Sequence, residues 1–188
     1  MVIAISSFFF AEEIMNLMYT INTGETEAHF ILRIAQSAKI FRLLMFSFVA
    51  ISSNYIFGTL LTANNSLKQL NLIAGGGLII NLSLNLILIP QFQSVGSAYA
   101  SLATQSITAI LQLYIVTKIF KFNINYKLIS NLILLVLLLL AEGYLLVEFS
   151  TIRWEFLLII MLVTGLLFTI ILKLVNIREF IVIIKDEN

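Results

Sequence analysis

The fold is decided by a charge-free stretch from Gln69 to Thr117, which reads QLNLIAGGGLIINLSLNLILIPQFQSVGSAYASLATQSITAILQLYIVT. Its 49 residues include no Asp, Glu, Lys, Arg or His, and a single membrane span needs only ~20 apolar residues. Pro90 lies near the middle and is followed by the largely polar residues Gln91 to Ser94. A proline next to polar residues favours a turn. The stretch therefore predicts two antiparallel helices, at 69–89 and 95–117.

The whole chain is similarly apolar, with 60% hydrophobic and 11% charged residues and a mean hydropathy of +1.03. A soluble domain carries roughly 25% charged residues, and disorder needs high charge and little apolar surface. We therefore predict an all-α, polytopic helical membrane protein with about six transmembrane helices in a single domain. The expected spans are 2–20, 30–63, 69–89, 95–117, 128–147 and 154–175, within a domain of residues 1–188.

The first expected span is unusually short. Only ten apolar or small residues separate Met1 from Glu12 and Glu13, whereas an independent span needs ~20. The segment also lacks the basic start and the small-residue cleavage site of a signal peptide. We interpret it as the remainder of a longer helix, which predicts that the chain is the C-terminal part of a longer protein.

Positive charges are unequally divided between the two sides that six spans would create. Both ends of the chain fall on the side with more of them: Lys68, Lys118, Lys121, Lys127, Lys173, Arg178 and Lys185. The other side carries Arg33, Lys39, Arg42 and Arg153. Because Lys and Arg are enriched in cytoplasmic loops, we expect both termini in the cytoplasm.

Residues for catalysis or metal binding are scarce. The chain has one His, His29, one Asp, Asp186, and no Cys. A zinc site needs several such ligands, and a Ser-His-Asp relay needs a suitably placed acid. We therefore expect no enzyme, no metal and no cofactor. A net charge of +1 also argues against a nucleic-acid partner.

Three charged residues within or beside the expected spans are candidates for function. Lys39 and Arg42 are three residues apart and share a helix face, where they either snorkel to the interface or bind an anionic head group. Glu142 lies inside the fifth span. We expect a partner such as Arg153 or a nearby Tyr to neutralise it, with proton coupling as a lesser alternative.

Polar and small residues inside the expected spans form two further patterns. Asn81 and Asn85 share one helix face, and Asn54 lies in the preceding helix. These amides either hydrogen bond between helices or line a hydrated cavity. The Gly75–Gly77 run and the four-residue repeat Gly96, Ala100 and Thr104 predict close helix packing, although a hinge at the glycine run is also open.

Four segments occur in a recognisable order: FAEEIMNLMY at 10–19, GTLLTANNSLK at 58–68, NLSLNLILIP at 81–90 and VGSAYASLAT at 95–104. Together they resemble the C-terminal region of bacterial polysaccharide flippases of the O-antigen and capsule type. These flippases belong to the multidrug, oligosaccharidyl-lipid and polysaccharide exporter superfamily. One departure is the turn after Pro90, where an aromatic residue and glycine are usual and this chain reads Gln91 to Ser94.

The resemblance implies a transporter that flips polyprenyl-pyrophosphate-linked oligosaccharide across the bacterial inner membrane during polysaccharide biosynthesis. Two lobes would open a central cavity to one side of the membrane and then to the other. The partners would be the bilayer, the lipid-linked oligosaccharide and an N-terminal lobe on the same or a separate chain. Lys39 and Arg42 would attract the head group, and Asn54, Asn81 and Asn85 would line the cavity. Two alternatives stay open, a truncated or split non-transporting membrane fragment and a piece of a cation-coupled multidrug exporter.

Overall fold

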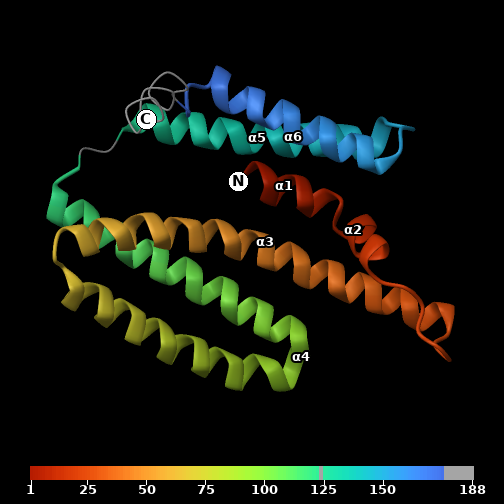
Figure 1. Ribbon diagram of the computed structural model, residues 1–188, viewed down its shortest axis with the longest axis horizontal. Helices are drawn as coiled ribbons and strands as arrows, with labels where there is room; N and C mark the ends of the chain where they lie inside the picture. Colours follow the sequence, from red (N-terminus) through yellow and green to blue (C-terminus); the bar gives the residue numbers. More distant parts are fainter. Residues whose placement is uncertain (123–124, 176–188) are drawn as a thin grey trace, which may run out of the picture. The chain divides into compact units, whose positions relative to one another are not determined.

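The computed structural model describes residues 1–122 and 125–175, and every regular element among them is an α-helix (Figure 1). The helices are α1 (Val2–Phe9), α2 (Ala11–Met18), α3 (Glu27–Ala63), α4 (Leu67–Phe120), α5 (Tyr126–Phe149) and α6 (Trp154–Ile171). The predicted all-α class is thus confirmed.

The chain forms two compact units. One unit contains α1 together with α5 and α6, and the other contains α2, α3 and α4. Four helices of the described residues, α3 to α6, are long and apolar enough to cross a membrane. Many large apolar side chains on them are exposed. Such surface is stable when lipid covers it, so the protein is a helical membrane protein.

The helix α3 is much longer than a membrane is thick. Its 37 residues correspond to about 55 Å at the rise of an α-helix, whereas the hydrocarbon core is about 30 Å. Its start is capped by the Thr26 hydroxyl, which accepts a hydrogen bond from the His29 N–H (3.4 Å). All charged residues of α3 lie in its first half, up to Arg42. The charge-free second half is therefore the membrane-spanning part.

The helix α4 is a hairpin of two helical arms that meet at Gln93 (Figure 1). Gln93 has φ 51° and ψ −130°, a backbone conformation that residues other than glycine rarely adopt. We call residues 67–92 the first arm and residues 94–120 the second arm. The break occurs in the turn that follows Pro90, and the two arms occupy the positions of the spans expected at 69–89 and 95–117.

Small residues bring the two arms of α4 together. A Cβ on Gly77 would lie 2.7 Å from the Thr108 methyl carbon, so the first arm approaches the second closely there. Gly96, Ala100 and Thr104 are all buried, as their four-residue spacing predicts. By contrast, a Cβ on Gly75 or Gly76 would meet no atom of the described residues within 4 Å. Packing therefore requires only the last glycine of the Gly75–Gly77 run.

The segment expected as one span at 2–20 consists of two eight-residue helices that separate at Phe10. Packing explains the break. In one unit, α1 packs against α5 and α6, and Gly143 makes room for the Phe9 ring. In the other unit, α2 buries Ala11 and Met15 against α3. An eight-residue helix is about 12 Å long, so neither helix can cross a bilayer alone.

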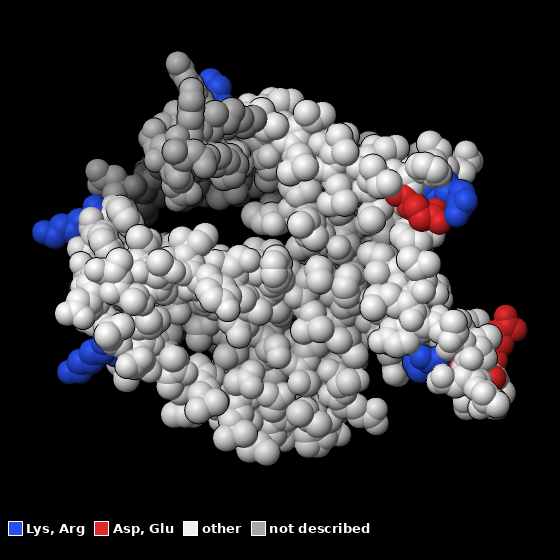
Figure 2. All heavy atoms as spheres, in the orientation of Figure 1, with Lys and Arg blue, Asp and Glu red and all other residues white. Residues whose placement is uncertain are grey.

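Most charged side chains lie near the ends of the helices, whereas Lys39, Arg42 and Glu142 lie within them. Figure 2 shows Lys, Arg, Asp and Glu atoms near these ends and an uncharged surface along the helices between them, on the face in view. In the α2–α4 unit, Lys68, Lys118 and Lys121 lie at the end where α3 joins α4. Arg33 belongs to the opposite end of α3. This pattern is what a bilayer requires, because charges are costly inside it.

Candidate functional site

The five residues selected from the sequence all belong to the α2–α4 unit, but they form two separate groups. Lys39 and Arg42 lie in the first half of α3, before its charge-free part. Asn54 lies in the second half of α3, and Asn81 and Asn85 lie in the first arm of α4.

Lys39 and Arg42 share a helix face but contact different helices. The Arg42 guanidinium is 3.3 Å from the Glu12 carboxylate on α2, and 31% and 54% of the two side chains are exposed. The Lys39 ammonium lies 5.9 Å from the centre of the Tyr99 ring on the second arm of α4. Exposed ion pairs contribute roughly 0–1 kcal/mol, so the Arg42 pair is weak.

The amides hydrogen bond α3 to α4 and also join the two arms of α4. The Asn54 nitrogen donates to the Gln105 carbonyl (3.2 Å), the Gln105 side-chain oxygen (2.9 Å) and the Thr108 hydroxyl (3.1 Å). The Asn81 nitrogen donates to the Thr104 hydroxyl (3.3 Å) of the second arm. We call Asn54, Asn81, Asn85, Thr104, Gln105 and Thr108 the polar seam. Interhelical bonding, one of the two interpretations left open for these amides, is therefore present.

The polar seam is only partly satisfied. The Asn85 nitrogen donates to the Asn81 carbonyl and side-chain oxygen, both at 2.9 Å. Two amide oxygens of the seam, Oδ1 of Asn54 and Oδ1 of Asn85, nevertheless are buried without a hydrogen-bond partner among the described residues, as is Oε1 of Gln112 on the second arm. An unpaired polar atom costs about 1–3 kcal/mol when buried. These oxygens can therefore still accept hydrogen bonds from water or from a polar ligand.

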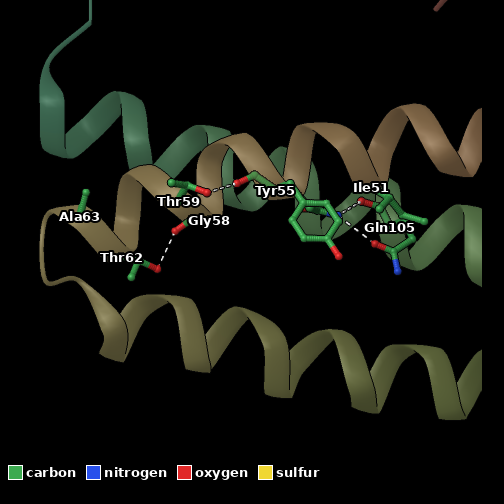
Figure 3. A pocket seen from close by; sticks show the side chains of 8 residues that line it. Ile51, Tyr55, Gly58, Thr59, Thr62, Ala63 and Gln105 are labelled. Carbon is green, nitrogen blue, oxygen red and sulfur yellow. Dashed lines mark hydrogen bonds between the residues drawn. The ribbon is translucent and has the colours of Figure 1, made fainter. Parts of the chain in front are cut away.

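A groove of about 690 Å³ opens beside the polar seam (Figure 3). We call it the Tyr55 groove, and its lining residues are Ile51, Asn54, Tyr55, Gly58, Thr59, Thr62, Ala63 and Gln105. All but Gln105 come from the charge-free half of α3. A Cβ on Gly58 would lie 3.7 Å from the Gln112 side-chain oxygen, so this oxygen lies close to one of the residues that line the groove.

Apart from Asn54, the groove residues were not selected from the sequence. A signal was available, because Ile51, Tyr55, Gly58 and Thr62 follow the three- and four-residue spacing of one helix face. In an apolar span, however, such a face with one glycine is typical of ordinary helix packing. The contribution of Gln105 depends on the register between α3 and α4, which the sequence does not contain.

A second polar cluster closes the loop before α3, outside the apolar spans. The Arg33 guanidinium binds both carboxylate oxygens of Glu25, at 2.9 and 2.8 Å, and the Thr20 carbonyl at 3.0 Å. The guanidinium also lies 5.6 Å from the centre of the Tyr19 ring. Hydrogen bonds from Arg33, and then from the Asn22 N–H, lower the pKa of the Glu25 carboxyl to about 2. The cluster thus ties the loop to the start of α3.

In the other unit, the partner expected for Glu142 is wrong. One Glu142 oxygen accepts a hydrogen bond from the Thr164 hydroxyl on α6, while Arg153 pairs with Glu155 at 2.7 Å. The second Glu142 oxygen has no partner within the described part of the chain. Across residues 1–122 and 125–175, no three His, Cys, Asp or Glu side chains converge as a metal site would require.

Comparison with known proteins identified no relative of this chain. No protein-family model, no curated protein and no solved structure matches it.

Proposed function

We propose that the protein is a membrane transporter that flips lipid-linked oligosaccharide across the bacterial inner membrane. The observation that carries the proposal is the polar seam, with buried and unpartnered amide oxygens in helices long enough to span a bilayer. Lipid cannot satisfy such atoms, whereas a hydrated path or a hydroxyl-rich head group can. The ordered segments that resemble polysaccharide flippases lead to the same activity.

In this proposal the seam forms one side of a transport path. The sugar head group moves along the polar atoms, while its polyprenyl tail stays in the lipid. The other side of the path comes from a second lobe, on this chain or on a partner chain, and the two lobes alternate access as in other transporters. The exposed apolar residues of α3 and α4 are available to contact that lobe and the lipid.

The charge pattern gives the proposed orientation. Lys68, Lys118 and Lys121 lie in the cytoplasm with the C-terminal end of α6, according to the positive-inside rule. Lys39 and Arg42 then lie toward the outer side, near the start of the charge-free part of α3. The exposed Arg42–Glu12 pair is weak enough for a pyrophosphate to replace Glu12, because a bidentate Arg–phosphate contact is stronger.

Deletion of the chain in its own host tests the proposal. We expect polyprenyl-linked oligosaccharide to accumulate in membrane extracts, measured by mass spectrometry, and the surface polysaccharide to decrease. The wild-type chain should restore both. A variant with Asn81→Leu and Asn85→Leu should not, whereas the matched control Asn71→Leu should, because Asn71 is an exposed residue of the same arm. Unchanged lipid-linked oligosaccharide in the deletion strain would overturn the proposal.

The charged candidates need a separate test in the same strain. Replacement of Lys39 and Arg42 by Ala should reduce transport, because the head group would lose its cationic partners. Lys118 and Lys121, replaced together, are the control, since they lie at the opposite end of the α2–α4 unit. Normal surface polysaccharide with the Lys39 and Arg42 variant would exclude these two residues from the site.

A further inference from the structure

The Tyr55 groove contains polar groups but no charge. No Lys, Arg, Asp or Glu is among the residues that line it. Along α3 it extends from Ile51 to Ala63, that is, from the middle of the charge-free part toward Lys68. A charged ligand here would lose its hydration without gaining an opposite charge, at a cost of several kcal/mol. The groove is therefore suited to a neutral ligand.

The hydrogen-bonding groups of the groove are largely acceptors. The Thr59 hydroxyl donates to the Tyr55 carbonyl (2.8 Å) and the Thr62 hydroxyl to the Gly58 carbonyl (2.9 Å) (Figure 3). Both protons are thus engaged, and the oxygen lone pairs stay available. The Asn54 nitrogen is also engaged, whereas its oxygen is buried without a partner in the described chain.

Two further side chains complete the groove. The Tyr55 side chain is 75% exposed and offers an aromatic face with a hydroxyl that donates and accepts. The Gln105 oxygen accepts from Asn54, and Figure 3 shows the Gln105 amide nitrogen directed away from that bond. The groove thus combines an aromatic face, several acceptors and one amide donor.

We propose that the Tyr55 groove binds the neutral sugar part of the transported glycan, with hydroxyl groups donating to Thr59 and Thr62 and one ring face packed on Tyr55. This inference rests on the proposed transport function and adds to it a substrate class, uncharged sugars as opposed to acidic ones. The volume of about 690 Å³ lies within the ~300–1,000 Å³ of ordinary small-molecule sites, which is room for a short oligosaccharide.

Binding can be measured without transport. The full chain, in nanodiscs of phosphatidylcholine, is mixed with n-octyl β-D-glucoside below its micelle concentration, and saturation-transfer NMR records the sugar-ring protons. The matched charged probe is n-octyl β-D-glucuronide, and empty nanodiscs report partition into lipid. We expect saturation of the glucoside ring above that of empty nanodiscs, and no such excess for the glucuronide.

Matched variants locate the binding. Thr62→Val should weaken glucoside binding about twofold to tenfold, the range for one neutral hydrogen bond, and Tyr55→Ala should remove most of the excess signal. Thr117→Val and Tyr114→Ala are the controls, because Thr117 makes the same kind of backbone bond (2.9 Å) and Tyr114 is also exposed. Circular dichroism and gel filtration verify folding, which Tyr55→Ala should preserve because the side chain contributes little to the core.

The outcomes separate this inference from the proposed function. Equal binding of glucoside and glucuronide, or glucoside binding that Tyr55→Ala and Thr62→Val leave unchanged, overturns the groove as a neutral-sugar site. If the host experiment still shows transport, the proposed function stands. Conversely, glucoside binding through Tyr55 together with unchanged lipid-linked oligosaccharide in the deletion strain supports the groove and overturns transport.

Discussion

Gln93 holds the strained backbone at the reversal of α4. Its φ of 51° and ψ of −130° cost a residue with a Cβ about 1–3 kcal/mol, whereas glycine adopts them freely. We predict that Gln93→Gly raises the free energy of unfolding by about 1 kcal/mol, measured by denaturant titration in detergent.

The control for this change is Gln91→Gly, two residues earlier in helical backbone. Glycine there should lower the stability by about 0.5–1 kcal/mol, because it adds flexibility to the unfolded chain without relieving strain. The same sign of change at both positions would contradict the strain at Gln93.

The Glu25 carboxyl makes the stability of the loop before α3 depend on pH. Its ordinary pKa of 4.5 falls to about 2, chiefly through the hydrogen bond from Arg33. A lowered pKa means that the folded loop is stabilised above the ordinary value and loses this stabilisation as the pH falls toward the folded value. We predict that the Asn22 N–H, which donates to Glu25 (3.0 Å), is less protected at pH 2 than at pH 5, when its hydrogen-exchange rate is compared with the intrinsic rate at each pH.

The variant Arg33→Gln tests the cause of that behaviour. Without the guanidinium, the pKa of Glu25 should rise toward its ordinary value, as followed by carbon-13 NMR of the carboxyl. The loss of protection at Asn22 should then begin at a higher pH. A Glu25 titration that is the same in both proteins would exclude Arg33 as the cause.

The hairpin of α4 depends on a glycine contact between its two arms. A Cβ on Gly96 would lie 2.3 Å from the Leu88 carbonyl oxygen and 2.6 Å from the Leu88 carbonyl carbon. Backbone atoms cannot move aside as a flexible side chain can, so the arms would have to separate. We predict that Gly96→Ala destabilises the protein by about 2 kcal/mol or more, measured by thermal unfolding in detergent.

Gly75→Ala is the matched control in the first arm. A Cβ there meets no atom within 4 Å in the described part of the chain, and alanine favours a helix over glycine by about 0.8–1 kcal/mol. The substitution should therefore be neutral or stabilising. Destabilisation of equal size by both substitutions would mean that contact between the arms is not what Gly96 provides.

For the helices, hydropathy predicts which segments are long, but it does not predict where the first segment breaks. The order of apolar residues from 2 to 11 contains no sign of a bend at Phe10. The bend follows from two packing partners, α5 and α6 for α1 and α3 for α2. Likewise, the spacing of Lys39 and Arg42 places them on one helix face, while their contacts with Tyr99 and Glu12 depend on where neighbouring helices lie.

For the molecule as a whole, the proposed orientation in the membrane is directly measurable, because the chain has no cysteine of its own. We predict that single cysteines at Ser66 and Lys121 react with a membrane-impermeant maleimide only after the inner membrane is opened. A cysteine at Gln91 should react in intact spheroplasts, because it lies at the opposite end of the α4 hairpin. The reverse pattern would place the connection between α3 and α4 outside and overturn the proposed orientation.

The sequence by itself determined the class of this protein and most of its helices. Lipid cannot hydrogen bond the backbone, so apolar stretches of sufficient length must form helices whatever surrounds them. The turn after Pro90 is equally local, because proline and polar residues end a helix without help from distant contacts. The excess of positive charge on one side is also a property of the sequence alone, and with it the proposed orientation.

The tertiary structure decided the rest: the break at Phe10, the division into two units, the pairing of Glu142 with Thr164 and the Tyr55 groove. Each of these depends on which side chains of distant segments meet. The reason is that lipid stabilises apolar surface wherever it is exposed, so hydropathy does not distinguish one helix partner from another. Close packing at glycines and hydrogen bonds between buried polar atoms determine which helices pack together. Both depend on the register between the helices.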